Sequence, residues 1–186
     1  LLHAQVNPHF LFNALNTLKA VIRRDSDQAG QLVQYLSTFF RKNLKRPAEI
    51  VTLADEIEHV NAYLQIEKAR FQANLQIQML VPDTLAHHQL PAFTLQPIVE
   101  NAIEHGLRSN NGEVLVRVER SASDLVLEVI DDGAGLPDDF DLRGRSSLGL
   151  SIVSTLITDL DGEFTLSNNA GDGSTARVRV MWAHAQ

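Results

Sequence analysis

The sequence lacks cysteine, and this absence excludes disulfide bonds and zinc sites built on cysteine ligands. Its apolar runs fall short of the roughly 18 residues that a membrane-spanning helix needs, and no signal peptide is visible. Basic residues are in the minority, with 16 Lys and Arg against 23 Asp and Glu and a formal net charge of -7. Because nucleic-acid-binding proteins usually present a basic face, this balance argues against direct nucleic-acid binding.

Two common nucleotide-binding motifs are also missing. There is no G-x-x-x-x-G-K-[ST] phosphate loop, and no G-x-G-x-x-G follows a predicted strand. Apolar residues, in contrast, make up 44% of the 186 residues, which is enough to bury the core of one domain, or of a small domain with a helical appendage. The chain opens at Leu1 inside a helical pattern, so we expect it to be a fragment of a longer protein.

Helical periodicity dominates the first part of the chain. Apolar residues recur every three or four positions in two stripes, Leu11, Leu15, Leu18 and Ile22 followed by Leu32, Leu36, Phe39 and Phe40. A polar break at 23–30 separates the stripes, with Asp25 or Ser26 as candidate N-cap. A third helix is predicted from Thr52 to about Phe71. One hairpin cannot cover both stripes, so we expect a second copy of the chain to complete a dimeric four-helix bundle.

The pattern changes after residue 72. A strand at 75–81 and a helix at 92–107 precede a predicted hairpin, a loop, a helix and a second hairpin, at 113–131, 132–148, 149–161 and 162–181. Helices mixed with antiparallel hairpins are typical of an α+β two-layer sandwich. We therefore divide the chain into a helical region over 1–72 and a mixed domain over 73–186.

A histidine at position 9 follows a proline in the stretch NPHFLFNAL (7–15). With the first stripe taken as the buried face, His9 projects about 160° away from it, so we expect it on a polar, solvent-facing side. Pro8 either kinks a helix that passes through it or begins a helix whose N-cap is Asn7. The spacing is also typical of a solvated surface histidine, but the irregular backbone would bring the imidazole within reach of a second domain.

Two polar pieces of the mixed domain suggest a nucleotide site. In LQPIVENAIEHG (95–106) and the arginine that follows, Asn101, His105 and Arg108 share one helical face, and an amide oxygen is a hard ligand that suits Mg²⁺. In DDGAG (131–135), Asp131 ends an apolar strand, where its carboxylate could accept a hydrogen bond from the exocyclic amine of a base. A plain polar helix face and an ordinary Asp-Gly turn explain the same residues.

A third piece, SLGLSIV (147–153), places a glycine before a helix. Helix N-terminal amides form an anion site that suits phosphates, and Arg143 and Arg145 in the preceding loop could add positive charge. An ordinary helix start is the alternative. GDGST (171–175) is a weaker fourth piece.

In this order and spacing the pieces resemble the GHKL-type ATPase fold of histidine kinases, gyrase, Hsp90 and MutL. Asn101 matches the magnesium asparagine of the N box. Asp131, with Gly133 and Gly135, matches the D-x-G-x-G box, whose aspartate holds the adenine amine. Gly149 and Leu150 match the second glycine box at the end of the lid. The resemblance implies ATP and Mg²⁺ as ligands.

The expected nucleotide site comprises residues from all of these pieces. They are Asn101, His105, Asp131, Gly133, Gly135, Arg143, Arg145, Leu148, Gly149, Leu150, Ser174 and Thr175, with Asn101 as the metal ligand.

The phrase QVNPHFLFNALN, followed by LQPIVENAIEHG, resembles the LytS-type (autolysin-sensor) sensor histidine kinases over essentially the whole chain. The resemblance implies that His9 is autophosphorylated and passes its phosphoryl group to an aspartate of a response regulator, often one with a LytTR DNA-binding domain. Members usually carry an N-terminal membrane sensor. We therefore expect this chain to be a cytoplasmic fragment of an inner or plasma membrane protein, without direct nucleic-acid contact.

Three positions depart from related patterns. Phe10 follows the histidine where many other histidine kinases have an acidic residue that takes the proton, so Glu100 is our candidate for the base. Pro97 stands where gyrase-like ATPases have a catalytic glutamate, which argues against water as the acceptor. Ser147 and Leu148 stand where the glycine box often begins with another glycine.

Two alternatives to the kinase hypothesis stay open. One is an ATP-hydrolysing clamp of the gyrase or Hsp90 kind, and the other is a nucleotide-binding regulatory module whose histidine is inert. The remaining histidines have no motif around them, and we expect them at the surface: His3, His59, His87, His88 and His184.

Overall fold

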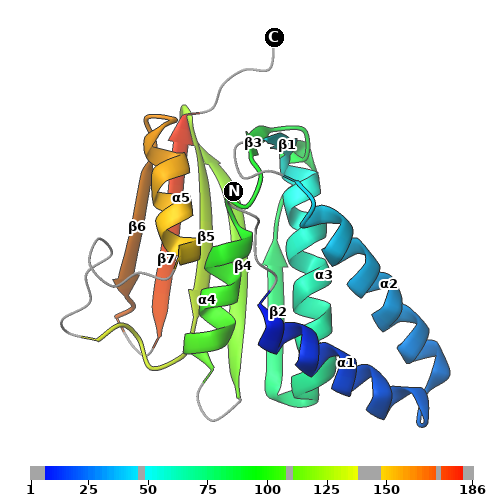
Figure 1. Cartoon of the computed structure of the whole chain (residues 1–186). Coiled ribbons are helices and arrows are strands. Elements are labelled where there is room, and N and C mark those ends of the chain that lie inside the picture. The colour runs from blue at the N-terminus through cyan, green and yellow to red at the C-terminus, as the bar shows by residue number, and fades with distance from the viewer. Residues whose placement is uncertain (1–6, 46–48, 108–110, 138–147, 171–172, 182–186) are drawn as a thin grey trace.

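The computed structural model describes residues 7–45, 49–107, 111–137, 148–170 and 173–181. Three helices precede a five-stranded sheet in the described part, and two further helices lie against that sheet (Figure 1). The architecture is the predicted α+β arrangement. No helix of the described residues is both long and apolar enough to cross a bilayer.

The first three helices begin at well-formed caps. They are α1 (Pro8–Ile22), α2 (Ser26–Lys42) and α3 (Leu53–Phe71). Asn7 is the N-cap of α1 with Pro8 in its first turn, so the helix begins at the proline. Asp25 caps α2 and accepts a hydrogen bond from the amide of Gln28 at 2.9 Å. Thr52 and Asp55 form a capping box at the start of α3.

The buried face of α1 differs from the expected stripe. Within the chain α1 packs through Phe10, Ala14 and Val21, whereas Leu15 is 51% and Ile22 56% exposed. The expectation that the stripe is buried is therefore wrong for the single chain, because the neighbouring face of the helix contacts α2 and α3. On α2 the prediction is confirmed, with Leu32, Leu36 and Phe39 buried and Phe40 partly buried.

The sheet has the strand order β2-β4-β5-β7-β6. Its strands are β2 (Leu75–Leu80), β4 (Gly112–Ser121), β5 (Asp124–Asp131), β6 (Glu163–Asn168) and β7 (Ser174–Met181). β2 pairs with β4 in parallel, and the other pairs are antiparallel. Both predicted hairpins are confirmed. The helices α4 (Gln96–Gly106) and α5 (Leu148–Thr158) cover one face of the sheet (Figure 1).

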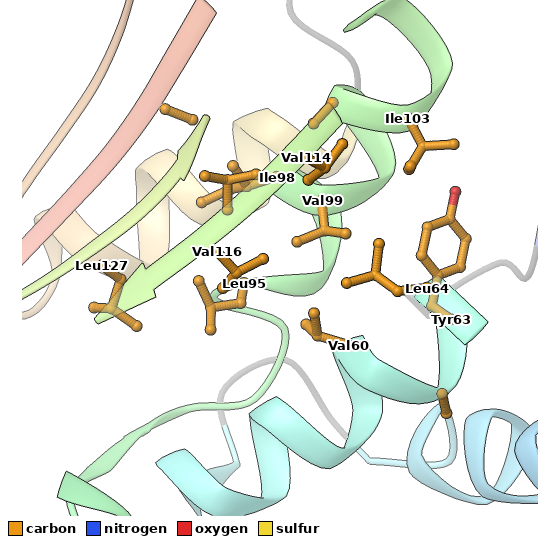
Figure 2. Close-up of a cluster of buried hydrophobic side chains, with 14 of the residues drawn as sticks. Val60, Tyr63, Leu64, Leu95, Ile98, Val99, Ile103, Val114, Val116 and Leu127 are labelled. Atoms are coloured by element: carbon orange, nitrogen blue, oxygen red, sulfur yellow. The ribbon is translucent and has the colours of Figure 1, made fainter. Parts of the chain in front are cut away.

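One continuous core joins the helices to the sheet. Figure 2 shows side chains of α3, α4 and the sheet meeting, with Val60 and Leu64 directed towards Val99 and Val116. All four are essentially inaccessible to solvent. The helical region and the mixed domain thus share a core along α3, and the division at residue 72 stays a prediction.

A small sheet and a buried carboxylate, neither of them predicted, connect α3 to α4. β1 (Ile50–Thr52) pairs antiparallel with β3 (Gln89–Pro91). Glu56 is buried, and its carboxylate accepts the backbone amides of Phe93 at 2.8 Å and Leu95 at 3.0 Å. The turn that these bonds hold delays the start of α4 to Gln96, four residues after the predicted start.

Candidate functional site

Asp131 lies at the end of β5 with a carboxylate that is already braced by the protein. It is 5% exposed. Its Oδ1 accepts the amides of Gly133 at 2.9 Å and Ser174 at 3.2 Å, and its Oδ2 accepts the Ser174 hydroxyl at 2.6 Å. A carboxylate offers about four lone-pair sites, so these three bonds leave room for one more donor, such as an exocyclic amine.

Glycines allow the backbone to close around this carboxylate. A Cβ on Gly133 would overlap the carbonyl of Gly106 at the end of α4. Gly173, at φ +91°, would place a Cβ against the carbonyl of Asp131 itself. Any larger residue at these positions would force α4, β5 and the turn before β7 apart.

Two asparagines that the sequence analysis missed hold the loop after Asp131. The Asn168 side chain donates to the carbonyl of Leu136 at 3.2 Å and accepts its amide at 2.5 Å. Asn169 donates to the carbonyl of Asp131 at 3.1 Å and accepts the Thr175 hydroxyl. An Asn-Asn pair between a strand and a glycine turn carries no signal of this role, because its partners are distant in sequence.

The expected residues of α4 and α5 have different surroundings. Asn101 is partly exposed and His105 exposed, one turn apart on α4. At the start of α5, Leu148 is exposed, but Leu150 is buried in the core, so only its backbone can face a ligand. A Cβ on Gly149 would lie 2.9 Å from Cβ of Pro97, so this glycine lets α5 approach α4 closely.

Some expected positions cannot be placed. Arg143, Arg145 and Arg108 lie outside the described residues, as do His3 and His184.

His9 lies exposed in the first turn of α1, as predicted. The Asn7 side chain makes two hydrogen bonds at this turn. Its Oδ1 accepts the His9 amide at 3.0 Å, and its Nδ2 donates to Oε1 of Glu104 at 2.9 Å. The Asn13 amide nitrogen lies 3.3 Å from the ring nitrogens of His9. The start of α1 is therefore attached to α4, the helix that also carries Asn101.

The carboxylates near His9 are not the one expected. A cavity of about 210 Å³ beside His9 is lined by Glu67 of α3 and Glu104 of α4. Glu100 is not among the described residues that line it, and it instead accepts a hydrogen bond from the Gln96 amide at 2.9 Å. Burial, above all, raises the pKa of Glu100, and the neighbouring Glu104 adds to this effect.

Two histidines that we expected at the surface are buried. His59 packs between the rings of Phe39 and Phe93, at centroid distances of 5.2 and 5.5 Å, and burial lowers its pKa to about 4. Burial also lowers the pKa of His88. The surface prediction was wrong for His59 because α3 is covered by α2 and by the turn before α4. It was also wrong for His88, which precedes β3. His87 is exposed, as predicted.

Comparison with known proteins agrees with this arrangement. A family profile described as "Histidine kinase" matches residues 1–75, and one described as "Histidine kinase-, DNA gyrase B-, and HSP90-like ATPase" matches residues 90–184. The chain is 63% identical to the Sensor histidine kinase BtsS of Escherichia coli (strain K12) over 98% of its length. It is 40% identical to the Sensor protein LytS of Enterococcus faecalis over 74% of its length.

The chain spans 33% of the length of the former protein and 24% of the latter. Among solved structures, the Acinetobacter baumannii histidine kinase AdeS aligns with a TM-score of 0.60 at 18% identity, covering 94% of this chain and 96% of that one. The histidine kinase domain of a blue-light activated kinase from Erythrobacter litoralis aligns with a TM-score of 0.57 at 18% identity, covering 94% and 93%. These two likenesses concern the fold.

Proposed function

Because the chain belongs to the LytS-type sensor histidine kinases, we propose that it is the catalytic part of a kinase that transfers the γ-phosphoryl group of ATP to His9. The observation that carries this proposal is the attachment of the His9 turn to α4 through Asn7 and Glu104. It brings an exposed imidazole to the helix that bears Asn101, next to the strand end that bears Asp131.

The base and the magnesium ion each have a matching group in the chain. Asp131 would accept the adenine amine with its remaining lone pair, and the backbone around Gly133 and Gly135 would lie against the base. Magnesium, when bound, neutralises phosphate charge, and the Asn101 side-chain oxygen is suited to hold it. Catalysis then rests on positioning and on charge neutralisation, since phosphoryl transfer has a loose transition state.

The exposed apolar side chains of α1 support a homodimer. Leu15 and Ile22 are each more than half exposed, and they lie beside the face of α1 that packs within the chain. A second copy would bury them in a four-helix bundle. We further propose that phosphorylated His9 serves an aspartate of a response-regulator receiver domain linked to a LytTR output. The whole protein would reach the membrane through a sensor region preceding this part.

The test is to incubate the chain with labelled ATP, with and without Mg²⁺, and to measure acid-labile phosphate on the protein. Wild-type protein should be labelled only with Mg²⁺, and Asn101→Ala should lose the label. His9→Gln should lose all label and still bind ATP, because the nucleotide residues lie on other elements. Phosphate release without label would favour the ATP-hydrolysing clamp, and binding without either would favour the regulatory module.

A further inference from the structure

His9 borders two adjoining cavities, and Arg70 and Phe71 line both. The first, of about 210 Å³, lies between α1, α3 and α4 and contains the Glu67 carboxylate. The second, of about 670 Å³, is rimmed by the exposed residues 72–74. His9 therefore borders both a smaller cavity that contains Glu67 and a wider one whose rim is exposed.

Glu67 has unused hydrogen-bonding capacity in the first cavity. It is 2% exposed, and its Oε2 has no hydrogen-bond partner among the described residues. Nη2 of Arg70 lies 2.6 Å from this oxygen in an ion pair that lacks hydrogen-bond geometry, while Nε of Arg70 is buried without a partner. Because a buried charge usually has both its charge and its hydrogen bonds satisfied, the incomplete pair at the cavity wall suggests a group that acts on something entering it.

The other nearby carboxylates are already engaged. Glu104 is exposed and accepts the Asn7 amide, and Glu100 accepts the Gln96 amide. Resting on the function proposed above, we propose that Glu67 accepts the proton that the His9 imidazole releases during phosphorylation, and that Arg70 then pairs with the new phosphoryl group.

The step balances as follows. The lone pair of one imidazole nitrogen forms the P–N bond, while the bond from the γ-phosphorus to its bridging oxygen breaks and its electron pair leaves with ADP. The ring is then cationic, and the N–H of its other nitrogen gives its proton to the Glu67 carboxylate. Neutral Glu67 no longer compensates Arg70, so the guanidinium becomes free to bind the phosphoryl oxygens of His9.

The electrostatics of the cavity support this role. Burial, as the largest cause, raises the pKa of Glu67 to about 7; Arg70 opposes the rise, and Glu104 and Glu100 add to it. A proton acceptor works best when its pKa lies near the working pH. Among the described residues, the titratable and charged groups that face Glu67 are Arg70 and Tyr63 on α3, Glu100 and Glu104 on α4, and His9 on α1.

The proposed role of Glu67 predicts how the phosphorylation rate depends on pH. Glu67 must be ionised to accept a proton, so the rate should fall as the pH drops through about 7. Loss of Glu67 should remove this contribution from the acid limb of the pH–rate profile.

The experiment measures single-turnover phosphorylation of His9 from about pH 5.5 to about pH 9, with ATP affinity measured in parallel. Glu67→Gln should slow the reaction about 100-fold, a typical contribution of general-base catalysis, lose one group from the acid limb and keep its ATP affinity. Glu67→Asp should restore part of the rate. Arg70→Gln should move the acid limb to higher pH, since Arg70 lowers the pKa of Glu67. Glu119→Gln, an exposed matched change on β4, should keep the wild-type rate and profile.

Each other outcome overturns the proposal in a recognisable way. If the wild type labels His9 but Glu67→Gln keeps its rate and acid limb, the inference is wrong and the kinase function stands. The inference is also wrong, and the kinase function stands, if Glu104→Gln rather than Glu67→Gln loses one group from the acid limb. If the wild type forms no phosphohistidine, the proposed function itself fails. Should Glu67→Gln not fold, an unshifted acid limb in Glu67→Asp and in Arg70→Gln would count against the proposal.

Discussion

The carboxylate of Asp131 is 5% exposed and receives three hydrogen bonds from Gly133 and Ser174, whereas the imidazole of His9 is exposed at the first turn of a helix that Asn7 attaches to α4. A group that selects a base benefits from a fixed position before the ligand arrives. A phosphoacceptor has to meet a donor and then a second protein. The two regions therefore differ in burial and in the number of hydrogen bonds to the functional side chain, as their proposed tasks require.

The largest expected effect concerns α1, the helix that bears His9, which we expect to pack against a second copy of the chain. Changing both Leu15 and Ile22 to Glu removes two large apolar side chains from each copy, and therefore four from the proposed dimer interface. At about 1.5 kcal/mol each, their loss should weaken the dimer more than a thousandfold. Sedimentation of the chain at several concentrations measures this change.

Leu160→Glu is the control for the dimer, because Leu160 is similarly exposed but follows α5. It should leave the dimer intact. A wild-type chain that sediments as a monomer at micromolar concentration would contradict the proposed bundle.

The close packing around Asp131 can be tested at Gly133. Gly133→Ala forces a Cβ into the carbonyl of Gly106, and we expect a loss of about 3 kcal/mol in the free energy of unfolding. Gly30→Ala is the matched change in the helical region, where an added Cβ meets nothing within 4 Å. It should stabilise α2 by about 0.5–1 kcal/mol. Denaturant unfolding of both variants decides the point, and equal effects would refute it.

Base selection is the next smaller effect. Guanine has a carbonyl where adenine has its amine, and it would face the Asp131 carboxylate with both acceptors unpaired, at a cost of about 1–3 kcal/mol. ATP should therefore bind at least roughly tenfold more tightly than GTP, and Asp131→Ala should remove most of that preference. Competition binding with both nucleotides measures it.

Asp132 serves as the neighbouring control for base selection. Its side chain is exposed, and its Oδ1 accepts the Glu113 amide at 2.7 Å, away from the Asp131 carboxylate. Asp132→Ala should keep the preference for ATP. A reversed result, with the preference lost at Asp132 and kept at Asp131, would shift the assignment by one residue.

The smallest effect concerns the attachment of the acceptor turn. Asn7→Ala removes the N-cap of α1 and its bond to Glu104, which should cost about 1 kcal/mol. Phosphorylation of His9 should slow several-fold, with ATP affinity unchanged, because the loss is confined to the acceptor. Asn16→Ala, an exposed change on the same helix, should not slow it. Equal labelling rates for Asn7→Ala and wild type would show that this attachment does not matter.

Much of the fold was predictable because its signals are local. The caps at Asp25 and Thr52 and the alternation of β4 and β5 lie within a few residues of the elements they define. Asp131 was identified because a strand end beside two glycines is itself a local pattern. The start of α4 was misplaced because Glu56, on another helix, holds the turn before it.

The helical and strand periods, the caps and the order of the nucleotide motifs could be recognised in the sequence, since each depends on neighbours along the chain. Three features depended on packing instead: which face of α1 is buried, where His59 lies and which carboxylates line the cavity beside His9. Spacing places a side chain on one face of its own element, but what that face meets depends on how separate elements pack. Phe10 rather than Leu15 therefore enters the core, and Glu67 rather than Glu100 borders the cavity beside His9.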